Sequence, residues 1–186
     1  MSADGSPSEP HDHDRIASSE AEALARRLRP VRAVGGVDVR ISARDGVSRL
    51  AALSESGGYR VKFPATDGGV PEAVILNTGG GLVGGDRIRL TATIDAQASA
   101  TFTTSAAERV YRSAGEAAEV NVTLKLGAGA RLAWLPQETC LYSGARLKRR
   151  FEIDMAGDAG LTLVEATIFG RVASGERPPE VGEPAG

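Results

Sequence analysis

The residues that could do chemistry gather first in a glycine-rich stretch, Asn77-Thr78-Gly79-Gly80-Gly81-Leu82-Val83-Gly84-Gly85-Asp86. Its Gly-x-Gly-x-x-Gly spacing matches a dinucleotide-binding loop, which holds a pyrophosphate at the N-terminus of a following helix. An alternating strand pattern follows here, so the match lacks its structural context. We interpret the stretch as a tight strand-to-strand crossing that needs positive φ and close backbone approach. The glycines concerned are Gly79, Gly80, Gly81, Gly84 and Gly85. Asp86 would cap this turn or face a partner.

Glu138 and Cys140 form a second candidate, because a carboxylate and a thiol are both possible metal ligands. The only histidines, His11 and His13, lie in a polar N-terminal stretch. One thiol and one carboxylate do not complete a tetrahedral site, and a nucleophilic cysteine would lack its histidine base. We therefore expect at most a transient, low-affinity metal contact, with Cys140 a small buried hydrophobic residue.

Charged and aromatic residues form a third candidate. Tyr111 and Arg112 are residue types that anchor protein interfaces, although the turn around Glu108 could equally be a solvated charged one. The basic run from Arg146 to Arg150 could meet an acidic partner or could protect a solvated strand edge against aggregation. Both alternatives stay open for each segment.

Composition limits the classes of protein that these residues could serve. The chain has 186 residues, a formal net charge of −2 and one cysteine. That size suits one globular domain, and the charge balance argues against nucleic-acid or anionic-membrane binding. Neither a membrane span of about 18 apolar residues nor a signal peptide is visible. A reducing, cytoplasmic location is the expectation.

The elements that must position these residues are predicted to be strands. Apolar and polar residues alternate at 37–42, 59–63, 87–95, 119–126 and 151–155, with glycine-rich turns between them. About ten short strands without a helical pattern between them predict an all-β domain of antiparallel meanders. No internal repeat of fixed period is visible.

The two ends of the chain and the last strand depart from that pattern. A capping box at Ser19 to Glu22 predicts a short helix within a polar N-terminal tail, and the segment from Arg177 is again tail-like. The strand Leu161–Phe169 has no polar face, so we expect it to be covered on both sides. Glu165 would then be a carboxylate in a partly apolar setting.

No catalytic set can be assembled from these residues. A Ser-His-Asp set, a CxxC motif and a phosphate loop are all missing. The residues alone therefore indicate a β-rich interaction domain that is not an enzyme.

Three ordered segments resemble the urease accessory protein UreD family, also called UreH. They are Pro71 to Arg87, Thr103 to Ser113 and Trp134 to Arg146, and the resemblance runs from about Leu50 to Glu176. The family implies an almost all-β, β-helix-like scaffold. It also implies a non-catalytic nickel-insertion chaperone that binds UreF, recruits the GTPase UreG through it and docks on apo-urease. No cofactor would be tightly bound, although Ni²⁺ would pass transiently.

The resemblance, joined to the candidates above, gives a set of site hypotheses. The nickel passage would use Asp86, Glu138 and Glu165, with Cys140 a poorer candidate. Partner binding would use Tyr111, Arg112, Gln137 and Arg146.

The predicted organisation is a tail with a short helix at 1–30, a UreD-like β domain at 31–176 and a tail at 177–186. Family members generally continue with further strands, so we expect this chain to be C-terminally truncated. Two other functions stay open: a generic β-sheet interaction domain, and a dinucleotide-binding oxidoreductase that uses the glycine loop.

Overall fold

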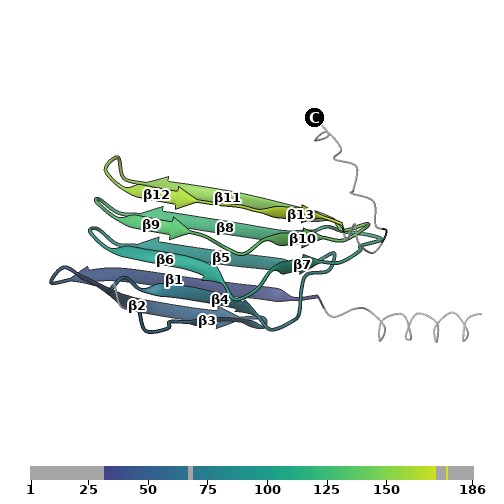
Figure 1. The fold of residues 1–186 in the computed structure, drawn as a ribbon, viewed down its shortest axis with the longest axis horizontal. Helices are drawn as coiled ribbons and strands as arrows, with labels where there is room; N and C mark the ends of the chain where they lie inside the picture. The colour runs from purple at the N-terminus through teal and green to yellow at the C-terminus, as the bar shows by residue number, and fades with distance from the viewer. Residues whose placement is uncertain (1–31, 67–68, 171–174, 176–186) are drawn as a thin grey trace, which may run out of the picture. The chain divides into compact units, whose positions relative to one another are not determined.

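The computed structural model describes residues 32–66, 69–170 and 175. These residues form thirteen strands and no helix, which confirms the predicted all-β class (Figure 1). The predicted helix at the N-terminus and both tails fall outside the described residues. Within the described part, no helical segment has the length and apolar character needed to span a bilayer.

Three sheets contain the strands. Sheet A has the order β11-β8-β5-β1-β2, with bounds Leu147–Met155, Ala118–Leu126, Arg87–Ile94, Val34–Arg44 and Val47–Ser56. Sheet B has the order β12-β9-β6-β4-β3, with bounds Gly160–Leu163, Arg131–Trp134, Ser99–Thr104, Glu72–Asn77 and Tyr59–Lys62. Sheet C has the order β13-β10-β7, with bounds Thr167–Phe169, Thr139–Leu141 and Glu108–Val110.

The chain visits the sheets in the order A, B, C and then repeats, so it winds as a β-solenoid (Figure 1). β5-β6-β7, β8-β9-β10 and β11-β12-β13 are three successive coils whose equivalent strands pair in parallel. An earlier coil consists of β1, β4 and Leu82, which bridges to Val110 of sheet C. The β-helix-like fold that the resemblance implied is therefore confirmed.

The prediction of antiparallel meanders holds for only part of the described chain. β1–β2 and β3–β4 are antiparallel pairs, whereas the other strand pairs are parallel. Alternation of apolar and polar residues shows that a segment is a strand with one buried face, but it does not show which strand lies beside it or in which direction that strand runs. Each turn after β5 leads into a different sheet instead of back along the same one.

A repeat is present in the structure although the sequence shows none of fixed period. Arg87 of β5 pairs with Glu119 of β8, and Glu119 pairs in turn with Lys148 of β11. The second step along the chain is shorter than the first, because the turns of the two coils differ in length. A search for one constant spacing therefore misses a repeat that backbone pairing makes plain.

β8 shows how the sequence specifies this arrangement. Its residues alternate between buried and more exposed positions, and Val120, Val122 and Leu124 point into the core. β5 places Ile88, Ala92 and Ile94 beside them in the next coil. Stacked apolar rows from successive coils make a continuous core between the sheets.

The prediction for residues 161–169 needs two corrections. The segment forms two short strands, β12 and β13, with residues 164–166 between them. It is also not covered on both sides, because β13 is exposed and belongs to the outermost coil of the described residues. A run of apolar residues shows which side chains would be more stable when buried. It does not show whether a neighbouring strand covers them.

Candidate functional site

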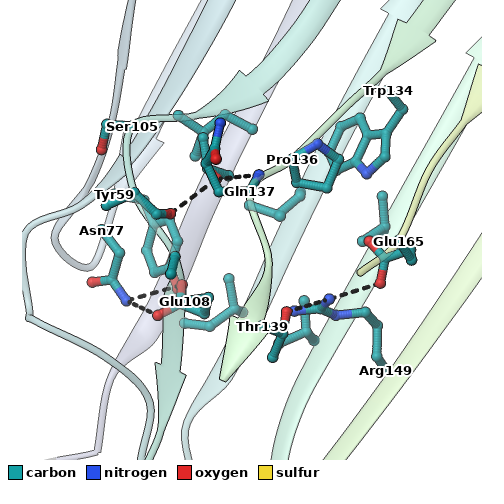
Figure 2. A pocket seen from close by; sticks show the side chains of 18 residues that line it. Tyr59, Asn77, Ser105, Glu108, Trp134, Pro136, Gln137, Thr139, Arg149 and Glu165 are labelled. Atoms are coloured by element: carbon teal, nitrogen blue, oxygen red, sulfur yellow. Dashed lines mark hydrogen bonds and ion pairs between the residues drawn. The ribbon is translucent and has the colours of Figure 1, made fainter. Parts of the chain in front are cut away.

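A pocket of about 70 Å³ lies inside the solenoid, between the inward faces of the three sheets. That volume holds a few water molecules. Its apolar wall includes Ile88, Val120, Val122 and Trp134. Its polar wall includes Tyr59, Asn77, Glu108, Thr139, Arg149 and Glu165 (Figure 2). We call these six residues the polar pocket.

Glu108 is the centre of one polar group in this pocket. Tyr59 Oη donates a hydrogen bond to Glu108 Oε2 at 3.2 Å, and Asn77 Nδ2 donates to Glu108 Oε1 at 3.0 Å (Figure 2). Burial raises the pKa of Glu108 above its usual range, while the Asn77 and Tyr59 hydrogen bonds act in the opposite direction. Burial and the neighbouring Glu108 also raise the pKa of Tyr59, so its hydroxyl stays protonated and remains a donor.

Arg149 is the centre of the second polar group. Its Nη1 donates to Glu165 Oε2 at 2.7 Å and to Thr139 Oγ1 at 2.9 Å (Figure 2). The side chains of Arg149 and Glu165 are 19% and 28% exposed. The three residues come from β11, from the segment between β12 and β13, and from β10. This carboxylate is therefore neutralised by a cation, whereas no salt bridge among the described residues involves Glu108.

Trp134 forms the boundary between the polar pocket and the apolar core. Its ring stacks on Phe102 with centroids 5.8 Å apart, and meets Phe151 edge-on at 6.4 Å. Two buried donors of the described chain have no hydrogen-bond partner, Trp134 Nε1 and Arg149 Nε, and both side chains line the pocket. An oxygen atom in the pocket would satisfy such donors.

The residues predicted for a metal passage are only partly brought together. Glu165 lines the pocket, whereas Glu138 and Cys140 are not among its lining residues. Thr139 points into the pocket, so alternation along β10 turns Cys140 toward the opposite face. Cys140 is half-buried and not in a disulfide. Within the described residues, no three His, Cys, Asp or Glu side chains come close enough to hold a metal ion together.

Asp86 is buried and holds the glycine loop in place. Its Oδ1 accepts a hydrogen bond from Ala33 N at 2.8 Å, and its Oδ2 accepts one from Val83 N at 2.9 Å. The alternative that Asp86 caps the turn is therefore confirmed. Both carboxylate oxygens of Asp86 already have backbone partners, and Asp86 does not line the pocket. A role for Asp86 in metal transfer stays a prediction.

The glycine loop is the tight crossing that the sequence predicted. Gly80, Gly81 and Gly85 have φ values of 78°, 139° and 89°. A side chain at Gly81 would collide with Arg109 O, 2.7 Å from the position of a Cβ atom. The loop leads into β5 and not into a helix, so the dinucleotide-binding alternative lacks the element that would hold a pyrophosphate.

Three of the four residues predicted to bind partners lie around this loop. Tyr111 Oη donates to Gly80 O at 3.0 Å, and its ring meets Tyr142 edge-on at 5.4 Å. Arg112 bridges to Ala145, and Arg146 Nη1 donates to Gly115 O at 3.0 Å. Gln137 is separate from them and lines the pocket. Whether these residues bind a partner stays a prediction.

Sequence reasoning missed Glu108, Tyr59, Asn77 and Arg149 as parts of one pocket. A signal for Glu108 was present, because Glu108 and the buried Val110 occupy the same face of β7. No comparable signal joins Tyr59 to Glu108, since the two are far apart in the sequence and the coil stacking alone brings them together.

Comparison with known proteins identifies relatives of this chain. Residues 33–180 match the model of a family described as UreD urease accessory protein. The chain is 50% identical over 146 residues to a urease accessory protein UreD of Bradyrhizobium diazoefficiens, which covers 78% of this chain and 53% of the relative. It is 47% identical over 153 residues to the one of Azorhizobium caulinodans, covering 82% and 56%.

A third relative, the urease accessory protein UreD of Brucella suis, is 43% identical over 149 residues, which covers 80% of this chain and 53% of the relative. The chain thus spans about half the length of the curated relatives it matches. The family match over residues 33–180 and the identity to these three relatives point the same way. The chain belongs to the UreD family of urease accessory proteins.

Proposed function

We propose that this chain acts in urease maturation as a non-catalytic chaperone subunit, and that Ni²⁺ passes through the polar pocket as cargo. The observation that carries the proposal is the pair of carboxylates, Glu108 and Glu165, which line one small cavity inside the solenoid. Membership of the family supports a role in urease maturation, and the cavity would be the place where the ion is held inside the molecule.

The ligand set suits a metal that must leave again. Carboxylate oxygens bind Ni²⁺ more weakly than nitrogen or sulfur ligands do, and the described residues offer no third acidic, histidine or cysteine ligand beside them. Such a site would bind the ion briefly. A complete ligand set would instead retain the ion and block its transfer.

The two carboxylates would play different parts. Glu108 has hydrogen-bond donors on both oxygens but no cation in a salt bridge, so an incoming cation would stabilise its ionised form. Glu165 is held by Arg149 and would have to leave that cation to reach a metal. Arg149 would then return Glu165 to its place and favour release of the ion.

The proposal includes the partners that the sequence suggested. UreF would bind this chain, UreG would be recruited through UreF, and the assembly would dock on apo-urease in the cytoplasm. The surface around the glycine loop, with Tyr111, Arg112 and Arg146, is the candidate contact, because it combines an aromatic pair with exposed arginines. Gln137 would contact a partner at the pocket.

The test is urease activation with isosteric variants. Glu108→Gln and Glu165→Gln remove a charge while keeping the side-chain volume, and we expect each to lower the amount of active urease formed from apo-urease, nickel, UreF and UreG. Glu119→Gln is the matched control, because Glu119 lies on the outer face of β8 and does not line the pocket. Activation at the native level by both pocket variants would refute the passage.

A pull-down with UreF separates transfer from assembly. The pocket variants should bind UreF as the native chain does, whereas Tyr111→Ala and Arg112→Ala should weaken that binding. If the pocket variants lose UreF binding as well, their loss of activation would reflect assembly, and the pocket would not be a nickel route.

A further inference from the structure

Two hydrogen-bond donors of the pocket are not explained by the passage of a cation. Trp134 Nε1 and Arg149 Nε are buried and have no hydrogen-bond partner among the described residues, and both side chains line the pocket. A metal ion cannot satisfy them, because an N–H group presents positive charge to its partner. Donors of this kind require an oxygen atom with a free lone pair.

Arg149 has one edge of its guanidinium group free. Its Nη1 atom makes both of its hydrogen bonds, one to Glu165 and one to Thr139. Nε and Nη2 lie side by side on another edge and make no hydrogen bond to a described residue. Two parallel N–H groups on one edge match the two oxygens of a carboxylate-like anion. Arg149 can therefore hold Glu165 and an oxyanion at the same time.

Trp134 supplies a further donor on the wall of the same cavity. Arg149 and Phe151 are consecutive inward residues of β11, and the Trp134 ring meets Phe151 edge-on with centroids 6.4 Å apart. Trp134 is 3% exposed, so bulk water does not reach its N–H group. The free donors thus come from two sheets, β9 of sheet B and β11 of sheet A, and line one pocket.

The size and walls of the cavity limit what these donors can bind. About 70 Å³ is space for a few water molecules, or for one small oxyanion such as formate, but not for a nucleotide or a sugar phosphate. Val120 and Val122 belong to the apolar part of the wall. Charge-assisted hydrogen bonds are stronger in such surroundings than in water. The donors and the volume together select a small planar oxyanion.

The two carboxylates of the pocket do not prevent this binding. Arg149 neutralises Glu165 through Nη1 at 2.7 Å, and the free edge of the guanidinium is made by other atoms. Glu108 belongs to the other polar group, with Tyr59 and Asn77, which Figure 2 shows apart from Arg149. An anion on the free edge would contact the cation directly, whereas Glu165 contacts a different atom of it.

We propose that the pocket binds a small planar oxyanion of the carboxylate type, held by the Nε and Nη2 edge of Arg149 and by Trp134 Nε1. This inference does not depend on nickel transfer, because neither donor can be a ligand of a metal ion. It gives the pocket a second ligand, of opposite charge to the proposed cargo.

The test is a titration of the full chain with sodium formate. Trp134 is the only tryptophan of the sequence, so the intrinsic fluorescence of the chain reports on the pocket. We expect formate to change the emission until the site is saturated. A matched titration with sodium chloride should give no saturable change, because a spherical anion has no separate oxygens for the parallel N–H groups.

Two conservative variants test the donors one at a time. Arg149→Lys keeps a positive charge beside Glu165 but lacks the planar edge, and we expect the dissociation constant of formate to rise at least about tenfold. Trp134→Phe keeps an aromatic ring against Phe102 but lacks the N–H group, and we expect a rise of at least about fivefold. The NMR line width of isotope-labelled formate measures binding to this variant, which has no tryptophan.

Arg150→Lys is the matched control, because Arg150 is the next residue of β11 and lies exposed on its outward face. It should bind formate as the native chain does. Circular dichroism should show that all variants keep the native strand content.

Three results would overturn the proposal. One is a native chain without saturable formate binding, which would leave water as the partner of both donors. Another is formate binding that either pocket variant retains at native strength. The third is equal binding of formate and chloride, which would reflect attraction by charge alone. None of these measurements involves nickel, so the proposed function is tested separately.

Discussion

The interior of the solenoid has two halves that differ in chemistry although the same strands build them. On one side of Trp134, the inward positions are apolar and fully buried, as at Ile94, Phe102 and Leu124. On the other side they carry Glu108, Arg149 and Glu165 around a cavity. β8 and β11 contribute to both halves, so the difference lies in the residue types and not in the backbone.

This difference separates stability from function. The apolar half removes hydrocarbon surface from water without leaving polar groups unpaired, which stabilises the fold. The polar pocket partly withdraws the Glu108 carboxylate from water, which costs free energy unless the group is paired or hydrogen-bonded. Residues that weaken a fold are retained where they do something else, and here that is the proposed transfer of nickel.

The largest expected effect on stability is in the apolar half. Leu124→Ala removes a fully buried side chain from the centre of β8 and should lower the free energy of unfolding by about 2–5 kcal/mol. Urea denaturation measures this loss. Nickel delivered per folded molecule should not change, and a fall in that quantity would break the separation between the two halves.

The next effect concerns the loop that closes the first coil. Asp86→Ala leaves the N–H groups of Ala33 and Val83 without their acceptor and should cost about 1–3 kcal/mol in unfolding free energy. Thermal denaturation checks this value. If Asp86 handles metal instead, the variant would keep the native melting temperature and lose urease activation.

The smallest expected effect is a dependence of stability on pH, which comes from Glu108 in the polar pocket and has no counterpart in the apolar half. The pKa of Glu108 is raised by burial, so the native fold favours its protonated form. Its contribution to stability is therefore complete below the unfolded pKa of about 4.3 and is lost as pH rises through the folded value.

Glu108→Gln has no carboxyl group to titrate at this position, so its stability is the reference for the native chain. As pH rises above about 4, the native chain should lose stability relative to Glu108→Gln until Glu108 is ionised in the folded chain as well. Denaturation curves of both proteins at several pH values give the difference. A difference that does not vary with pH would mean that Glu108 is not a buried acid.

The sequence predicted the strands well and their neighbours poorly. Alternation at residues 87–95 and 119–126 identified β5 and β8 to within a residue or so, because a half-buried strand must alternate. The parallel stacking of those strands depends on pairing between one coil and the next, which no local pattern encodes. The β-solenoid came from the resemblance to a family and not from the residues alone.

The site was predicted in the same uneven way. Asp86 as a cap follows from local sequence, because a loop exit is visible there, whereas the strand that was to place Glu165 in a partly apolar setting is interrupted at residues 164–166. The contact between Arg149 and Glu165 joins β11 to the segment between β12 and β13, and the contact between Tyr59 and Glu108 joins β3 to β7. Such side-chain contacts between distant residues form only when the chain has folded into the β-solenoid.

The central claim is that the polar pocket is the nickel route, and counting metal tests it most directly. The double variant Glu108→Gln/Glu165→Gln should yield urease with markedly less bound nickel than the native chain yields, measured by elemental analysis after activation with UreF and UreG. Glu119→Gln should match the native chain, and all three proteins should be folded under the conditions of the assay. Urease with native nickel content from the double variant would contradict the account.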